Sequence, residues 1–443
     1  MDSLPVLCGV FLLLACTGGV AKRTEFRGGS DADKQDWGYV NVRPDAHMFW
    51  WLYVARSDPS AAAPLVIWLQ GGPGGSSTGF GNFMEIGPQD VNLNPRNITW
   101  VQHANLLFID NPVGTGFSYV TNMSALASNN QQIADDLVAT LIAFFKKRPE
   151  FESTPLFIFS ESYGGKMTAG FGQALAEAIK VGNISCNFRG VALGDSWISP
   201  VDSTNSWGPY LHSISLLDKK GLDAVQKAAQ SIEDAVNQGN YKEATALWSK
   251  CEDIVENETF GVNFYNILTN YGVSALGLQT RQQLSFVEKL YNRHVKPLQQ
   301  GNLNDLMNGP IKKKLGIPDN VTWGGQSGQV FQHLATDFMK PVYNVVDDLL
   351  TSNLNVVVYN GQLDLIVDTP GTEAWVQRLK WPGLTAFNSL SWAPVYVSQQ
   401  EAAAFVKQYK NFSFYWILKA GHMVPADAPA TAYKMMQLIT SQS

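Results

Sequence analysis

Six short apolar runs, each bounded by turn-forming residues, recur along this 443-residue chain. Between the second and third runs, residues 129–147 place apolar side chains at helical spacing and end in basic residues before Pro149. Short continuous apolar runs are typical of strands buried on both faces of a parallel sheet. Strand, helix and strand in this order predict an α/β fold with a mostly parallel central sheet flanked by helices. The six runs span residues 65–69, 106–109, 156–159, 190–193, 356–359 and 414–418.

The pattern changes between residues 206 and 324. There the sequence is helical, charged and irregular, and it carries no strong strand signal. We interpret this segment as a helical insertion, or lid, over the sheet. The core is then expected in two parts, residues 22–205 and 325–443.

The first residues have the pattern of a secretory leader. An apolar run over residues 4–15 is followed by small residues and then by Lys22-Arg23. The run is too short to cross a bilayer, and its flanks resemble a signal peptide, although Asp2 stands where a basic residue is usual. We expect a signal peptide over residues 1–21 and no membrane span after its removal.

Two further features bear on the compartment. Six Asn-x-Ser/Thr sites favour passage through the secretory pathway, and they predict a glycoprotein that is secreted or lysosomal. Of four cysteines, two fall in the leader, which leaves Cys186 and Cys251 either as one disulfide or as two buried thiols. The six sites are Asn97, Asn122, Asn183, Asn257, Asn320 and Asn411.

Charge and ligand spacing exclude some classes of function. The formal net charge is −6 and the basic residues are scattered, so no surface for a nucleic acid backbone is indicated. The sequence has neither a Cys-x-x-Cys motif nor histidines at metal-ligand spacing. We therefore expect no nucleic acid partner, no metal and no cofactor.

The run PLFIFSESYGG places Ser162 directly after an apolar strand, and Gly164-Gly165 permit a tight turn into the following helix. This arrangement predicts the nucleophile elbow of an α/β-hydrolase. The G-x-S-x-G pattern has glycine where this chain has Ser160, so the turn is expected to be tighter here.

In α/β-hydrolases the acid and the histidine follow the nucleophile in that order. His422 follows the strand FSFYWILKAG, whereas the other histidines beyond Ser162 lie on helical stretches. Asp364 follows the strand NVVVY and is the best candidate for the acid, with Asp368 and Asp195 as rivals. The predicted chemistry is attack by Ser162 on a carbonyl, with His422 as the base and the aspartate orienting its ring.

The tetrahedral intermediate needs N–H donors for its oxyanion. One is expected from the backbone of Tyr163, the residue after the nucleophile. Another is expected from the glycine-rich run QGGPGGSS, whose residues let backbone groups approach a substrate. A phosphate-binding role for this run is disfavoured, because no Gly-Lys-Ser/Thr follows it.

Five motifs in this order resemble those of the serine carboxypeptidase family: WLQGGPGGSS, IDNPVGTGFSY, SESYGG, YNGQLD and KAGHMVPADAP. The resemblance implies an α/β-hydrolase that releases C-terminal residues from peptides through an acyl-enzyme. It makes Gly72 and Tyr163 the oxyanion donors. It assigns binding of the substrate carboxylate to Gln70, Gly71, Glu85 and Glu161. Two glutamates that share protons beside a carboxylate predict an acidic pH optimum.

The chain departs from the family pattern at three positions. The family usually has Asn at Gln70, Cys at Gly75 and Gly at Ser160, and most of its disulfide scaffold is missing here. Carboxylate recognition is thus expected to be weakened or retuned. Two alternatives stay open on the sequence: an acyltransferase that discharges the acyl-enzyme to another nucleophile, and a stabilising or binding partner whose catalysis is dispensable.

Overall fold

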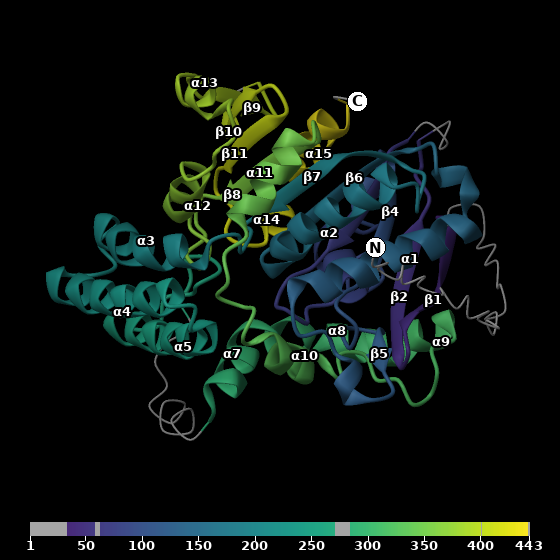
Figure 1. Ribbon diagram of the computed structural model, residues 1–443, viewed down its shortest axis with the longest axis horizontal. Coiled ribbons are helices and arrows are strands. Elements are labelled where there is room, and N and C mark those ends of the chain that lie inside the picture. Colours follow the sequence, from purple (N-terminus) through teal and green to yellow (C-terminus); the bar gives the residue numbers. More distant parts are fainter. Residues whose placement is uncertain (1–32, 58–62, 271–283, 400, 442–443) are drawn as a thin grey trace, which may run out of the picture.

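The computed structural model describes residues 33–57, 63–270, 284–399 and 401–441, so the expected signal peptide lies outside the described residues. Eleven strands within these ranges form one mixed sheet, in the order β1-β2-β4-β3-β6-β7-β8-β11-β10-β9, with β5 paired to β2 (Figure 1). The strands are β1 (Gln35–Arg43), β2 (Ala46–Tyr53), β3 (Leu65–Leu69), β4 (Asn105–Asp110), β5 (Tyr119–Val120), β6 (Pro155–Glu161), β7 (Asn187–Gly194), β8 (Asn355–Gly361), β9 (Ala393–Tyr396), β10 (Ala402–Tyr409) and β11 (Phe412–Ile417).

The middle of the sheet is parallel. Strands β4, β3, β6, β7, β8 and β11 pair in parallel, and each coincides with one of the six predicted apolar runs, the last of which extends one residue beyond β11. The prediction of an α/β fold with a mostly parallel sheet is therefore confirmed. The antiparallel strands at the two ends, β1 with β2 and β9 with β10, were not predicted. Strand β10 is only partly buried, so it lacks the continuous apolar run of a central strand.

Helices cover both faces of the sheet, because side chains alternate along each strand. Ile67 joins an apolar cluster with residues of α1 (Asn130–Lys147) and α2 (Tyr163–Lys180). The neighbouring Trp68 points the other way and joins a second cluster with α15 (Pro429–Thr440). The helix predicted over residues 129–147 is thus confirmed as α1. The remaining helices of the core are α11 (Tyr343–Thr351), α12 (Thr369–Val376), α13 (Leu384–Asn388) and α14 (Val424–Asp427).

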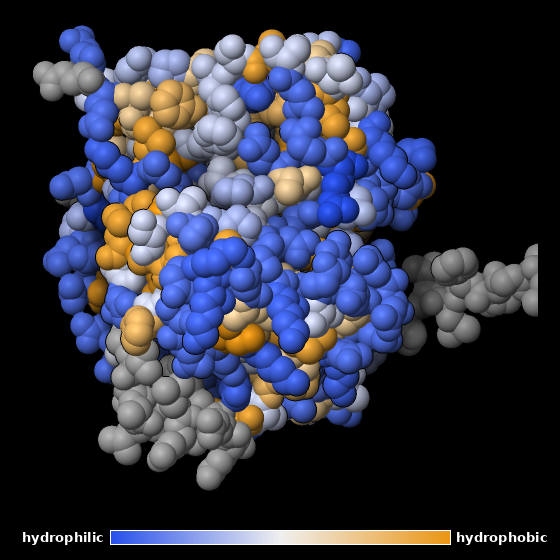
Figure 2. Space-filling model, turned by 90° about the vertical axis from the view of Figure 1, so that its left-hand side faces the viewer, coloured by the Kyte–Doolittle hydropathy of each residue, from blue (hydrophilic) through white to orange (hydrophobic). Residues whose placement is uncertain are grey.

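A long helical segment joins β7 to β8 and contributes no strand to the sheet among its described residues. Figure 1 places α3, α4 and α5 beside the sheet, and Figure 2 shows a largely hydrophilic surface on that side of the molecule. The segment begins at Pro200, earlier than the expected limit of 206, and the limits 206–324 stay a prediction. Its helices are α3 (Pro200–Ser213), α4 (Lys219–Asn237), α5 (Tyr241–Glu258), α7 (Phe286–His294), α8 (Asn302–Leu306), α9 (Lys312–Leu315) and α10 (Ser327–Leu334).

Short helical turns complete the chain, of which one matters for the site. It is η2 (Ser77–Ile86), a π-helical segment that follows the glycine-rich run. The others are η3 (Trp100–Gln102), η4 (Met123–Ala125), η5 (Pro149–Phe151), η6 (Lys296–Gln299) and η7 (Met307–Ile311). In the part of the chain that the structure covers, every helix is too short or too polar to cross a membrane.

The structure corrects the proposed disulfide. Cys186 and Cys251 are free thiols. Cys251 is fully buried in α5, which packs against α4 and α7, whereas Cys186 is half-buried just before β7. Packing, and not a cross-link between these residues, holds the helical segment against the core.

The predicted glycosylation sites differ in their surroundings. Five of the six asparagines are exposed. Asn411 is half-buried, and its amide nitrogen donates hydrogen bonds to Leu350 O at 2.9 Å and Leu354 O at 2.8 Å. A glycan on this nitrogen would disrupt both bonds, so Asn411 is the least suitable acceptor in the folded chain.

Candidate active site

Ser162 forms the junction between β6 and α2. Its backbone has φ 62° and ψ −129°, a strained conformation for a residue other than glycine. The turn is tight: a Cβ at Gly164 would lie 2.2 Å from Leu69 O, and one at Gly165 would lie 1.9 Å from Ser196 Oγ. These two glycines therefore allow the helix to start against the sheet, with the Ser162 side chain held at its end.

Ser160 lies in β6, two residues before Ser162. Its buried hydroxyl donates to Ala192 O on β7 at 3.3 Å. Its carbonyl accepts a hydrogen bond from the Tyr359 hydroxyl at 3.0 Å. The serine that departs from the G-x-S-x-G pattern thus bonds to neighbouring strands, while Gly164 and Gly165 provide the close approach of strand and helix.

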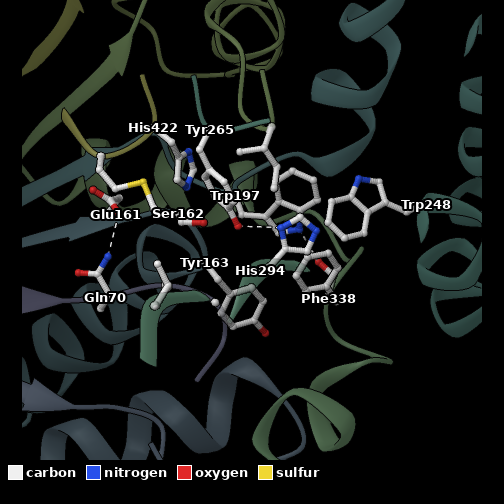
Figure 3. Close-up of a pocket in the computed structure, with 15 residues that line it drawn as sticks. Gln70, Glu161, Ser162, Tyr163, Trp197, Trp248, Tyr265, His294, Phe338 and His422 are labelled. Atoms are coloured by element: carbon white, nitrogen blue, oxygen red, sulfur yellow. Dashed lines mark hydrogen bonds between the residues drawn. The ribbon is translucent and has the colours of Figure 1, made fainter. Parts of the chain in front are cut away.

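His422 and Asp364 are joined beside Ser162. Nδ1 of His422 lies 2.8 Å from Asp364 Oδ2, and both side chains are buried. Nε2 of His422 is buried and makes no hydrogen bond within the described residues. It faces the pocket that Ser162 also lines (Figure 3). The structure therefore brings together the three residues that the sequence proposed as a catalytic triad.

The two rival aspartates have other partners. Asp368 caps α12, where it accepts hydrogen bonds from Gly371 N at 2.6 Å and from the Ser206 hydroxyl. Asp195 accepts from Gly361 N at 2.7 Å. The bond to Nδ1 of His422 comes from Asp364, so the geometry favours Asp364 as the acid.

Burial sets the protonation state of the histidine. It lowers the pKa of His422 to about 4, because the charged ring would lose its hydration, although Asp195 and Asp427 oppose this shift. The ring is therefore neutral, and able to accept a proton, above about pH 4. A neutral imidazole bonded to a carboxylate is the form that a general base requires.

The proposed oxyanion donors lie next to the nucleophile. Gly72 and Tyr163 both line the pocket. Tyr163 is the first residue of α2, and the N–H groups of a first helical turn have no partner within their helix. A Cβ at Gly71 would lie 2.5 Å from the Cβ of Ser162, so the glycine-rich run passes directly against the nucleophile. The arrangement allows two backbone N–H groups to converge on one oxygen.

A buried carboxylate anchors the glycine-rich run. Asp110 accepts hydrogen bonds from the Ser76 hydroxyl at 2.7 Å, Thr78 N at 3.0 Å, the Thr78 hydroxyl at 2.7 Å and Phe117 N at 2.8 Å. Sequence reasoning missed this role, although Asp110 lies in the quoted motif IDNPVGTGFSY. An aspartate at the end of a buried strand beside several small polar residues was the available signal.

The residues proposed for carboxylate binding form a connected group on one side of Ser162. Trp68 Nε1 donates to Gln70 Oε1 at 2.8 Å. Gln70 Nε2 donates to Glu161 Oε1 at 2.8 Å (Figure 3). Gln70, Gly71 and Glu161 line the pocket, and Glu85 is fully buried nearby. The Trp68 bond fixes the amide so that its nitrogen faces Glu161.

Burial also keeps protons on the two glutamates. It raises the pKa of Glu85 to about 8, against the opposing effect of the neighbouring Glu161 and Gln70 side chains. It raises the pKa of Glu161 well above its usual range, and the charge of Glu85 adds to this shift. Because two adjacent buried carboxylates repel each other, the pair holds a shared proton at acidic and neutral pH.

Two departures from the family pattern fit each other in space. A Cβ at Gly75 would lie 2.8 Å from Gly71 O and 3.3 Å from Cγ of Gln70. The backbone N–H of Gly75 donates to Gly71 O at 2.8 Å. The longer side chain at position 70 therefore has room because the residue at position 75 has no side chain.

An aromatic wall lies on the other side of Ser162 from Gln70 (Figure 3). His294 is part of this wall: its Nδ1 lies 2.7 Å from the Tyr265 hydroxyl, and its Nε2 lies 2.7 Å from Glu252 Oε1. Sequence reasoning missed these residues, because they come from separate segments of the chain and buried aromatic side chains look like ordinary core. The wall consists of Trp197, Trp248, Tyr265, His294 and Phe338.

One group of side chains in the described ranges has the geometry to hold a metal ion. It consists of Asp195, Asp364 and His422, whose ligand atoms lie within 4.8 Å of one another. The same histidine nitrogen that faces the carboxylates is bonded to Asp364. The close approach of these three side chains is therefore explained by hydrogen bonding around the histidine.

Comparison with known proteins agrees with this geometry. The family model described as serine carboxypeptidase (peptidase S10) matches residues 27–442. Retinoid-inducible serine carboxypeptidase of Rattus norvegicus is 58% identical over 418 residues, covering 92% of each chain. Serine carboxypeptidase-like 51 of Arabidopsis thaliana is 42% identical and covers 99% of this chain and 97% of its own.

A solved structure extends the comparison to the fold. The prohormone-processing carboxypeptidase KEX1(Δ)p of Saccharomyces cerevisiae matches with a TM-score of 0.75 at 23% identity. The match covers 93% of this chain and 92% of the other. At this identity the likeness bears on the fold alone.

Proposed function

The chain belongs to the serine carboxypeptidase family and is a hydrolase of that class, and on this premise we propose that Ser162, His422 and Asp364 release C-terminal residues from peptides at acidic pH. The observation that carries the proposal is the bond between Asp364 and Nδ1 of His422, with the free Nε2 facing the pocket of Ser162. A carboxylate-binding group beside this pocket explains why a chain end would be chosen over an internal bond.

The proposed reaction begins when Ser162 Oγ attacks the scissile carbonyl and gives its proton to Nε2 of His422. Asp364 holds Nδ1–H and stabilises the resulting imidazolium. The N–H groups of Gly72 and Tyr163 bind the oxyanion, a type of donor usually worth about 3–4 kcal/mol each. His422 then protonates the leaving amine, and a water molecule repeats the sequence to release the acyl group.

The substrate carboxylate is expected to bind between the Gln70 amide, the N–H of Gly71 and the Glu161–Glu85 pair. Glu161 in its protonated form donates a hydrogen bond to this carboxylate, whereas the ionised form repels it. Since Gln70 Nε2 is already bonded to Glu161, the amide acts mainly by holding Glu161 in place. This is the expected consequence of the longer side chain at position 70.

The proposed route of the chain is the secretory pathway, with an extracellular or lysosomal destination. The leader pattern over residues 1–21 and five exposed Asn-x-Ser/Thr sites support it. The substrates follow from the site: peptides or proteins with a free C-terminal carboxylate.

The test compares wild type with Ser162→Ala on N-blocked dipeptides that carry either a free or an amidated C-terminus. Release of the last residue from the free acids alone, lowered about 10³-fold or more by the substitution, is the expected result. Circular dichroism and thermal unfolding of both proteins serve as the folding control. Cleavage that persists in Ser162→Ala, or equal cleavage of acids and amides, would overturn the proposal.

A further inference from the structure

A third carboxyl group lies under the proposed triad. Asp195 follows β7 and is completely buried. Its backbone has φ 42°, in the left-handed region where Asp, Asn and Gly are the residues most readily accepted. Asp195 N donates to Tyr359 O at 2.8 Å, and Oδ1 accepts from Gly361 N at 2.7 Å. The side chain is therefore fixed to the end of β8, the strand that leads into the Asp364 loop.

The second oxygen of Asp195 faces the triad. Carboxyl oxygens of Asp195 and Asp364 and a ring nitrogen of His422 lie within 4.8 Å of one another. Oδ2 of Asp195 is buried and has no hydrogen-bond partner in the described ranges. A buried carboxyl oxygen is costly to leave without a partner, and the adjacent group able to pair with it is the carboxylate of Asp364.

We propose that Asp195 is a positioning residue for the reaction: its protonated carboxyl group donates a hydrogen bond to Asp364, which keeps Asp364 ionised and aimed at Nδ1 of His422. The inference rests on the proposed triad chemistry. The proton stays on Asp195 throughout the reaction, so no charge beyond that of Asp364 is added beneath the imidazole. The hydrogen bonds then run from Asp195 to Asp364 and on to Nδ1 of His422, whose Nε2 faces the pocket that Ser162 lines.

The electrostatics of the group agree with this order of protonation. Burial raises the pKa of both Asp195 and Asp364 well above the usual range. The interaction between the two side chains raises the pKa of Asp195 further and lowers that of Asp364, so Asp364 is the one that ionises. Three other titratable groups interact with Asp195. His422 favours the ionised form of Asp195. A negative charge on Asp195 would in turn disfavour the ionised forms of Glu161 and Tyr359.

Two substitutions separate a hydrogen-bond donor from a charge. Asp195→Asn keeps an acceptor for Gly361 N and an N–H donor for Asp364, but it cannot ionise. Asp195→Gly removes the donor and suits the positive φ, so the backbone stays relaxed. The substrate is an N-blocked amino acid ester without a free carboxylate, because its hydrolysis does not depend on the Glu85–Glu161 pair.

Asp195→Gly is expected to lower kcat about 10- to 100-fold with little change in KM, because Asp364 loses its donor. Asp195→Asn is expected to recover most of this loss. It also keeps kcat at alkaline pH where the wild type falls, since an amide has no proton to lose. Wild-type kcat and pH profile in Asp195→Gly, or equal impairment of the two variants, would overturn the inference.

A second measurement does not depend on turnover. An NMR titration follows the His422 ring, assigned by comparison with His422→Gln. Without its donor, Asp364 holds imidazolium more strongly, so Asp195→Gly is expected to raise the pKa of His422 while Asp195→Asn leaves it near the wild-type value. A lower pKa in Asp195→Asn would mean that Asp195 is charged, and the inference would be wrong. Absent ester hydrolysis in a wild type that gives the expected titration would instead count against the proposed function alone.

Discussion

The backbone carbonyl of Tyr265 accepts the N–H of His422 at 2.8 Å, and the Tyr265 ring lies 5.0 Å from the imidazole at an angle of 60°. Tyr265 belongs to the helical segment between β7 and β8, whereas His422 belongs to the last part of the core. The neighbouring Phe264 O accepts the N–H groups of Leu365 and Ile366, beside Asp364. One stretch of the helical segment therefore supports the loops of both the histidine and the acid.

The Tyr265→Phe variant tests whether the tyrosine hydroxyl contributes to this support. The change removes the hydroxyl that bonds to His294 but keeps the ring and the backbone. We expect the stabilisation of the transition state to fall by about 1 kcal/mol, which is a roughly fivefold decrease in kcat/KM. One buried hydrogen bond is lost, while the packing against His422 stays. His294→Asn serves as the comparison, and effects of the two changes that do not add in the double variant would show that the bond carries them. An unchanged kcat/KM in Tyr265→Phe would mean that the ring and the backbone act alone.

The pH dependence follows from the two shifted pKa values of the site. His422 must be neutral to accept a proton, so kcat/KM is expected to rise as pH increases through about 4. The glutamate pair must hold a proton to bind a carboxylate, so kcat/KM for peptide acids is expected to fall as pH increases through about 8. Initial rates between pH 3 and about pH 10 would test both limbs.

The double variant Glu85→Gln/Glu161→Gln tests whether the glutamate pair causes the fall of kcat/KM at alkaline pH. Its amides cannot ionise, so the rise of KM at alkaline pH is expected to disappear. Glu177→Gln, at an exposed position paired with Lys180, is the control and should leave the profile unchanged. If the alkaline limb persists in the double variant, the pair is not the group that controls binding.

The sequence carried enough information to predict the central sheet and the three residues around the nucleophile, because both depend on local patterns. Continuous apolar runs indicated the parallel strands, and the residues directly after them included Ser162 and Asp364. The antiparallel end strands and the aromatic wall were missed for a different reason. Tyr265 and Phe338 reach the pocket through packing between distant segments, which no local spacing reports.

Asp110 is expected to contribute strongly to stability. Its carboxylate accepts four hydrogen bonds, from Ser76, Thr78 and Phe117. Asp110→Asn would set an NH₂ group against N–H and O–H donors, and we expect it to lower the free energy of unfolding by about 1–3 kcal/mol or more. Urea unfolding against an Asp223→Asn control, an exposed position, checks this; equal stability of the two variants would contradict it.

Because both thiols are free, the thermal stability of the protein is expected not to depend on reducing agents. Cys186 and Cys251 form no bond, and burial raises the pKa of each thiol to about 12, which leaves little reactive thiolate. Dithiothreitol is therefore expected to leave the Tm unchanged. A drop in Tm corresponding to the loss of about 2–5 kcal/mol would indicate a disulfide instead. Mass spectrometry after alkylation of the unfolded protein counts the thiols directly.

The aromatic wall is expected to select the penultimate residue of the substrate. It lies across Ser162 from the carboxylate-binding group, and a peptide whose last residue sits by Gln70 must direct the residue before it toward Phe338 (Figure 3). The Phe338 ring stacks on Tyr163 at a centroid distance of 5.8 Å, so its size sets the space next to the oxyanion donors. Phe338→Leu should therefore favour large penultimate side chains over alanine by about tenfold in relative kcat/KM.

Phe331→Leu is the matched control for this change. Phe331 is also fully buried and lies 5.5 Å from Phe338 between ring centroids, but it is not among the residues that line the pocket. Both substitutions remove the same atoms from the same cluster, so a loss of packing affects both. A panel of N-blocked dipeptides with one constant C-terminal residue separates the two effects. A change of preference in Phe338→Leu alone assigns the wall to the penultimate residue, whereas the same change in both variants assigns it to general loosening of the helical segment.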